Sequence, residues 1–236
     1  MTKSESKQTN LSSSEDFKMR GTQITRLETF MDAAFAFAMT MLVISVGTIP
    51  KNYPELIISL KEIPAFVCSF FIIMTFWLSH RTWSRRYGLE DKNTIFLSIS
   101  LIFILLIYMY PLRLIFSNLF AWLSNGWFPS TFEVKSKSEL IGLFVIYGIG
   151  LFAMAGIISL LYLRAYSKRI FLKLNKFEVH KTKNKITLLA AVSFTGLVAT
   201  FLALILSENL ALWSVLTYLT IPITVTFINR FYKKNK

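Results

Sequence analysis

The sequence predicts an all-α membrane protein with six transmembrane helices and both termini in the cytoplasm. Of its 236 residues, 54% are hydrophobic and 17% are charged, and the mean hydropathy is +0.52. The apolar residues form six runs, each close to the roughly 20 residues that a helix needs to cross about 30 Å of hydrocarbon. The Lys and Arg residues lie between these runs. A water-soluble domain does not fit this pattern, and nucleic-acid binding, which the net charge of +13 could otherwise indicate, is a remote alternative.

The domain organisation follows from the same composition. Residues 1–24 are polar and rich in Ser, Thr and Lys, so we expect a disordered cytoplasmic leader that is retained, because it does not resemble a signal peptide. Residues 25–230 form the transmembrane domain, and residues 231–236 form a basic cytoplasmic tail. The predicted spans cover about residues 28–49, 56–79, 93–114, 139–164, 185–207 and 209–229.

The second span is the shortest apolar run, and Pro64 lies near its first turn or kinks it. Between the third and fourth spans, residues 116–138 mix aromatic and polar side chains, which is typical of a membrane interface. We expect this segment to anchor the outer surface, as a short helix lying on it. A pore mouth or a ligand lid is the functional alternative.

The charges of the connections give the orientation of the spans. Basic residues are abundant in the leader, in the second and fourth connections and in the tail, and sparse in the other connections. Cytoplasmic loops carry the excess of Lys and Arg in membrane proteins. Both termini are therefore predicted to be cytoplasmic, which requires an even number of spans.

The sequence lacks the residue patterns of enzymes and metal sites. It contains no HExxH, no GxSxG and no P-loop, and Cys68 is its only cysteine. The two histidines, His80 and His180, both fall in basic segments without a carboxylate cluster. We expect no enzyme activity, no cofactor and no bound metal. The glycines of Tyr147–Gly150 are interpreted as helix packing rather than as a carbonyl filter.

The first span carries the most informative residues. Thr25 and Glu28 have the spacing of a capping box, so a helix is expected to begin at Thr25. Asp32 lies where this helix enters hydrocarbon, and it therefore needs hydrogen bonds from other helices. As a functional group it could belong to a cytoplasmic gate, but a structural clamp is the better interpretation of spacing alone.

One stripe of this helix consists of Phe37, Met41, Ile44 and Thr48, with Thr40 one step to its side. Taken alone, such a stripe is usually a packing surface or a lipid-facing surface. A resemblance gives it further meaning.

Residues 26–40 resemble the first-helix signature of the transmembrane protein 175 family, the lysosomal potassium channel and its prokaryotic relatives. That signature reads R-x-x-x-F-S-D before a small, apolar helix with a threonine, and Arg26, Phe30, Asp32 and Thr40 match it. Met31 stands in place of the usual serine.

The resemblance extends into the next two helices. Trp77 and His80 are similar to the W-x-x-H at the end of the family's second helix, and a long third helix would close at Pro111.

The resemblance implies a homotetrameric potassium-permeable channel in which the first helix of each subunit lines the pore. Rings of apolar side chains at Phe37, Met41 and Ile44 would form the constriction instead of a carbonyl filter, with Thr40 and Thr48 as polar neighbours. Phe37 and Met41 are bulkier than the aliphatic residues usual there. The motif residues Arg26, Phe30, Asp32, Trp77 and His80 would tie the first helix to its neighbours.

The implied partners are the lipid bilayer and permeating cations, K⁺ above all, with Na⁺ and H⁺ as alternatives. Short loops favour a prokaryotic plasma membrane. Two other functions stay open. One is a six-helix transporter or permease subunit, although its spans would be expected to hold several acids at mid-membrane. The other is a non-conducting protein whose basic connection at residues 164–185 docks to anionic lipid or a soluble partner.

Overall fold

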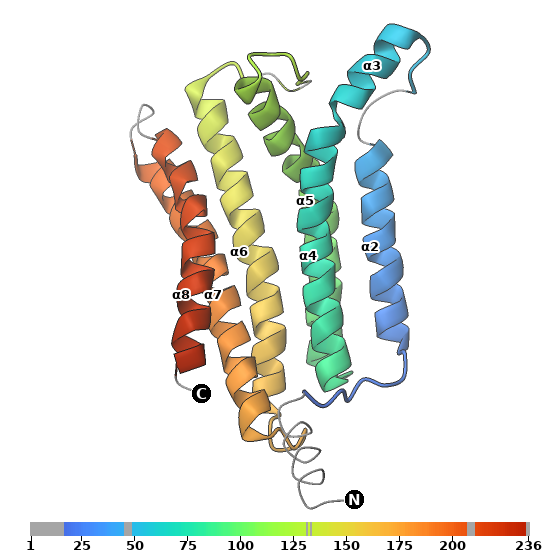
Figure 1. Ribbon diagram of the computed structural model, residues 1–236, viewed down its shortest axis with the longest axis vertical. Helices are drawn as coiled ribbons and strands as arrows, with labels where there is room; N and C mark the ends of the chain where they lie inside the picture. Colours follow the sequence, from blue (N-terminus) through green and yellow to red (C-terminus); the bar gives the residue numbers. More distant parts are fainter. Residues whose placement is uncertain (1–16, 45–48, 131, 133, 207–210, 235–236) are drawn as a thin grey trace, which may run out of the picture.

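The computed structural model describes residues 17–44, 49–130, 132, 134–206 and 211–234. These residues form an elongated bundle in which the long helices run side by side (Figure 1). The elements are α2 Arg26–Ile44, α3 Tyr53–Lys61, α4 Ile63–Tyr87, α5 Lys92–Leu123, α6 Lys137–Ser167, α7 Lys176–Ile205, the 3₁₀-helix η1 Ala211–Leu219 and α8 Thr220–Lys234.

Five of the described helices are long and apolar enough to cross a membrane by length and composition: α2, α4, α5, α6 and α7. The sixth predicted span, residues 209–229, is divided between η1 with nine residues and α8 with 15. Pro222 gives a reason for the division, because proline lacks the N–H that an uninterrupted α-helix would need there and fits only in a first turn. Both pieces pack on α7.

The second predicted span also differs in its bounds. The chain forms the short helix α3, breaks at Glu62, and continues as α4 with Pro64 in its first turn, as the sequence predicted. α4 extends to Tyr87, eight residues beyond the predicted end at 79, because Gly88 provides the left-handed C-cap with φ of 57°. The basic residues that we assigned to a loop therefore belong to the last two turns of a helix.

The third helix does not close at Pro111. α5 continues through this proline to Leu123, and the ribbon changes direction in its upper part (Figure 1). Residues 116–123 are thus helix, and the segment that follows is a turn at Asn125 and Gly126 instead of a surface helix. The Trp127 ring lies against Phe128. The Lys61 ammonium group lies over the Trp127 ring, 4.5 Å from the ring centroid.

The part of the leader that the structure describes is held in place, unlike our prediction for residues 1–24. The Arg20 guanidinium group forms an ion pair with Glu178 at 2.7 Å and donates to the Leu172 carbonyl at 2.8 Å. The Arg20 and Gly21 N–H groups donate to the Arg85 carbonyl. Composition could not indicate these partners because they lie far along the chain. Residues 1–16 lie outside the described residues.

The core lies among α2, α4, α5 and α6, whose inward side chains include the fully buried Phe35, Ile73, Leu101 and Ile158. α6 and α7 approach each other closely where Gly148 faces Gly196. This contact confirms that the glycines of Tyr147–Gly150 serve helix packing.

Ion pairs fasten helices near their ends. At one end, Arg113 of α5 lies 3.0 Å from Glu62, and both side chains are buried. At the other end, Asp91 pairs with Arg164 at 2.6 Å and with Lys168 at 3.5 Å. Partial burial of Asp91 raises its pKa, but the hydrogen bonds from Thr94 and Arg164 and the nearby positive charges outweigh this effect and hold the pKa below its usual value.

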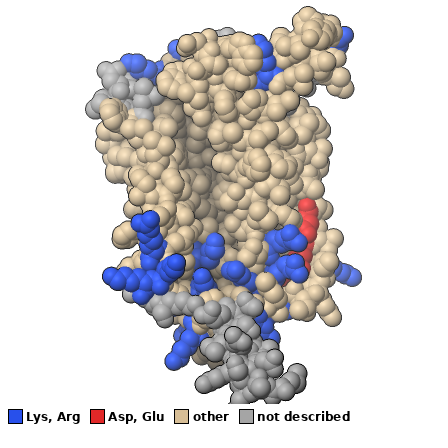
Figure 2. All heavy atoms as spheres, in the orientation of Figure 1, with Lys and Arg blue, Asp and Glu red and all other residues tan. Residues whose placement is uncertain are grey.

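Charged residues are distributed unequally along the bundle. On the face that Figure 2 shows, Lys and Arg gather toward one end, a band without charged residues follows, and a few cations lie at the other end. The segment that leads into α2 and the end of α8 both lie toward the strongly basic end (Figure 1).

Candidate functional site

The candidate site begins at the N-terminus of α2, where the predicted capping box is present. The Glu28 N–H donates to Thr25 Oγ1 at 3.2 Å, and the Thr25 N–H donates to Glu28 Oε2 at 3.4 Å. These reciprocal bonds satisfy two donors that a helix start leaves open. The cap therefore fixes where α2 begins and the register in which its side chains face the bundle.

α2 has two different faces. Met31, Phe35, Ala38 and Leu42 are buried against α4 and α5 and recur at the spacing of one helical stripe. On the outward side Phe37 is 57% exposed and Ile44 is 60% exposed.

A hydroxyl group, that of Thr40, lies on the same outward side of α2. Thr40 is exposed. It lies nine residues after the buried Met31, and because each residue of a helix turns the chain by about 100°, the two side chains point to opposite sides of α2. Its hydroxyl donates to the Ala36 carbonyl at 3.0 Å, which leaves the hydroxyl oxygen as an acceptor toward the open side. Small side chains at Ala33 and Ala36 continue the exposed surface.

The residues of the predicted stripe therefore share the outward face only in part. Phe37 and Ile44 share the outward face with Thr40, whereas Met41 is half-buried and packs against the core at the edge of that face. Thr48 lies outside the described residues.

Asp32 has the partner from another helix that its position requires. The Trp77 Nε1–H of α4 donates to Asp32 Oδ1 at 2.7 Å, and the Arg81 guanidinium group lies 5.1 Å from the Trp77 ring centroid. Asp32 is six residues from the start of α2, which places it about 9 Å along the helix. The bond between α2 and α4 therefore lies about a third of the way along α2 from its start and near the middle of α4.

The other motif residues do not join this bond. His80 is buried in α4 and its Nε2 lies 3.0 Å from Ser98 Oγ of α5, so it links α4 to α5. Arg26 and Phe30 are exposed, and the Arg26 side chain makes no hydrogen bond or ion pair with any described residue. Within one subunit, the Arg26, Phe30 and Asp32 motif is therefore not a connected network.

A cavity of about 290 Å³ lies beside the Asp32 bond. Acidic groups of α2, basic groups of α4 and leader residues share its wall: Glu28, Asp32, His80, Arg81, Arg85, Gly21, Thr22 and Ile24. The mixture of charges favours water and internal pairing over one type of ion. Among the described residues, no three His, Cys, Asp or Glu side chains gather as the ligands of a metal would.

Sequence reasoning missed the residues that connect α4 to the rest of the bundle. Trp83 is fully buried and its Nε1–H donates to the Leu161 carbonyl of α6 at 2.8 Å. One turn later, the Tyr87 hydroxyl lies 2.7 Å from Thr182 Oγ1 of α7. A usable signal was present, because Phe76, His80, Trp83 and Tyr87 recur on one helical face. The predicted span, however, ended at residue 79 and so left out the last three of these residues.

Comparison with known proteins identifies relatives of this fold and sequence. The family model of the endosomal/lysosomal potassium channel TMEM175 matches residues 26–111. A protein of Marivirga tractuosa named "Potassium channel" is 35% identical over 238 residues, which cover 94% of this chain and 93% of that protein. The crystal structure of a threonine-to-alanine variant of the potassium channel MtTMEM175, in complex with a nanobody fusion protein, superposes with a TM-score of 0.83. That match has 32% sequence identity and covers 93% of this chain and 97% of the other.

Proposed function

Because this chain belongs to the TMEM175 family of potassium channels, we propose that it conducts K⁺ through a pore lined by α2. As a member of a channel family it is an integral membrane protein and not an enzyme. The observation that carries the pore assignment is the outward face of α2, where Phe37, Thr40 and Ile44 have no cover in the single subunit.

A homotetramer would give this face a partner. α2 lies at the edge of the bundle, with one side packed on α4 and α5 and the other side open (Figure 1). Four such edges around a common axis would enclose the outward faces and form a channel between them. In this arrangement, Phe37 and Ile44 supply successive apolar rings, and Met41 contributes from the flank.

An apolar ring acts on an ion through water. A narrow ring of Phe and Ile side chains offers few dipoles to replace the hydration shell, so it slows ions or dewets and closes. Thr40 lies between the two rings on the same face and provides the nearest hydroxyl oxygen. Selectivity among K⁺, Na⁺ and H⁺ then depends on the ring diameter and on Thr40.

We also propose the orientation and location that the sequence predicted. The strongly basic end would face the cytoplasm together with both termini, since Lys and Arg concentrate on that side of membrane proteins. A bacterial plasma membrane is consistent with the Marivirga relative.

The transporter alternative has little physical support among the described residues. Asp32 lies about 9 Å into α2 and is bonded to Trp77, and the buried Glu62–Arg113 pair lies where α3, α4 and α5 meet at the opposite end of the bundle. A midplane site for a coupled ion would require acids between these two levels. A measurement of K⁺ flux distinguishes the channel from the non-conducting, partner-binding alternative.

The test is K⁺ flux through the purified protein in liposomes under a K⁺ gradient, comparing the wild type with Phe37→Ala. Removing the ring side chain should raise K⁺ flux by about tenfold, which corresponds to about 1.4 kcal/mol off the barrier, and should weaken discrimination against Na⁺. Phe103→Ala is the matched control, because Phe103 is 65% exposed on α5, away from the proposed pore face.

Two results would contradict the proposal. Equal effects of Phe37→Ala and Phe103→Ala would remove α2 from the pore. If folded, tetrameric wild type and Phe37→Ala both pass no monovalent cation, the protein is not a channel. Light scattering of the same preparation measures the oligomeric state.

A further inference from the structure

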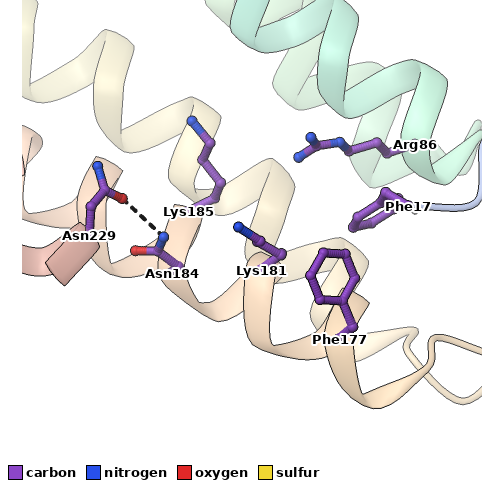
Figure 3. Close-up of a pocket in the computed structure, with 7 residues that line it drawn as sticks. All are labelled: Phe17, Arg86, Phe177, Lys181, Asn184, Lys185 and Asn229. Atoms are coloured by element: carbon purple, nitrogen blue, oxygen red, sulfur yellow. Dashed lines mark hydrogen bonds between the residues drawn. The ribbon is translucent and has the colours of Figure 1, made fainter. Parts of the chain in front are cut away.

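A pocket at the basic end of the bundle has a composition that the channel function does not use. It lies where the leader, α4, α7 and α8 meet, and its volume is about 340 Å³. Seven residues line it: Phe17, Arg86, Phe177, Lys181, Asn184, Lys185 and Asn229 (Figure 3).

Its charge is entirely positive. Arg86 reaches from α4 toward α7, where Lys181 and Lys185 follow each other by one helical turn (Figure 3). None of the described residues that line the pocket is Asp or Glu. The nearby acid of α7, Glu178, accepts two hydrogen bonds from Arg20 at 2.9 and 2.7 Å and does not line the pocket. Three cations around one space repel each other unless an anion lies between them.

Contacts with neighbouring residues fix the polar side chains of the pocket wall, but one of their hydrogen-bond donors has no acceptor in the part of the chain that the structure describes. The Arg86 guanidinium group stacks over the Phe17 ring at 4.7 Å, and its buried Nε–H has no acceptor among the described residues. The Asn184 amide donates to Asn229 Oδ1 at 3.0 Å, which fixes both side chains at the wall (Figure 3). A planar guanidinium group with a free donor and two ammonium groups suit a multivalent oxyanion such as phosphate.

A furrow leads from this pocket toward the middle of the bundle. Lys185 also lines a second cavity, of about 220 Å³. The rest of that cavity is apolar or carries hydroxyl groups: Thr75, Leu78, Ser79, Thr82, Tyr162 and Leu189. On α4 these residues climb from Thr82 to Thr75, away from the basic end, and Figure 2 shows a hollow between α4 and α6 above the basic band.

We propose that Arg86, Lys181 and Lys185 bind the phosphate of an anionic phospholipid headgroup, with the lipid tail in the adjoining furrow. Basic pockets between transmembrane helices at the cytoplasmic side are suited to such headgroups. The furrow distinguishes the lipid from a soluble phosphate, because a soluble ligand held at the basic pocket would make no contact with Leu78 and Leu189 further along the furrow, whereas a lipid tail would.

The test is native mass spectrometry of the purified full chain in detergent, titrated with phosphatidylglycerol or with zwitterionic phosphatidylcholine. sn-Glycerol 1-phosphate serves as the soluble competitor. We expect retention of phosphatidylglycerol over phosphatidylcholine and no displacement by glycerol phosphate. This readout does not require ion conduction, so its failure leaves the proposed channel function untouched.

Charge-matched variants assign the binding to the pocket. Lys181→Gln/Lys185→Gln should lower the affinity for phosphatidylglycerol by about tenfold. Lys176→Gln/Lys183→Gln removes the same charge from exposed positions of α7 outside the pocket and should leave the affinity nearly unchanged. Arg86→Gln should weaken binding, whereas the neighbouring Arg85→Gln should not.

Three outcomes would overturn the proposal. Equal losses in the two lysine pairs would mean attraction to net charge alone. Displacement of the lipid by glycerol phosphate would make the ligand a soluble phosphate. Equal retention of phosphatidylglycerol and phosphatidylcholine by the wild type would mean that the pocket does not discriminate between anionic and zwitterionic headgroups.

Discussion

At the scale of single residues, Asp32 explains how an acid is tolerated where α2 enters the apolar part of the bundle. Its carboxylate is exposed in the subunit, yet it accepts a 2.7 Å hydrogen bond from the Trp77 indole. This bond ties the first third of α2 to the middle of α4. The sequence indicated that Asp32 needed such a partner.

Trp77→Phe should show how much this bond stabilises the protein. The substitution keeps a ring between the helices but removes the N–H donor, so we expect the free energy of unfolding to fall by about 1 kcal/mol. Thermal unfolding in detergent measures the change. Trp122→Phe is the control, because Trp122 is 76% exposed at the other end of the bundle. Equal losses in the two variants would mean that the bond to Asp32 contributes nothing.

At the scale of helices, the α6–α7 pair depends on the absence of side chains at one crossing. A Cβ atom on Gly196 would lie 2.6 Å from the Gly148 carbonyl oxygen and 2.9 Å from the Phe152 backbone nitrogen. Backbone atoms of a packed helix cannot move aside as a flexible side chain can. In lipid, where apolar burial does not drive helices together, such close packing is a main source of association.

Gly196→Ala should therefore separate α6 from α7 and destabilise the protein by about 1–3 kcal/mol. Gly142→Ala is the matched control on α6, since its new methyl group would meet nothing within 4 Å. That variant should be neutral or stabilising by up to about 1 kcal/mol, because alanine favours a helix more than glycine does. Thermal unfolding of both variants in the same detergent measures these changes in stability. If the Gly196→Ala protein is as stable as the Gly142→Ala protein, close packing at Gly196 does not stabilise the α6–α7 pair.

At the scale of the whole molecule, the unequal charge of its two ends predicts its orientation in the membrane. The α6–α7 connection and the end of α4 place Lys and Arg at one end, while Trp127 and Phe128 mark the other. The first end should face the cytoplasm, where positive loops are retained.

Cysteine labelling in intact cells tests this orientation. In a Cys68→Ser background, Trp127→Cys should react with a membrane-impermeant maleimide added outside. Lys176→Cys should react only after the cells are opened. The opposite pattern would reverse the topology, and reaction of both cysteines in intact cells would show that residues 127 and 176 lie on the same side.

The sequence by itself determined the all-helical membrane class, the capping box at Thr25 and the family, because hydropathy, local spacing and a short motif are properties of neighbouring residues. The resemblance seen in the first three helices is confirmed over nearly the whole chain by the 35% identical relative. The sequence also indicated which residues of α2 share a stripe, since helical spacing fixes angular position.

Only the tertiary structure decided which side of that stripe is covered. It turned Met41 toward the core and left Phe37 outward, because packing on α4 and α5 selects the buried face. It also brought Arg20 to Glu178 and Trp83 to the Leu161 carbonyl. These partners are separated by many residues, so no local pattern could reveal them. Composition detects whether a segment is polar, but a distant partner decides whether that segment is held in place.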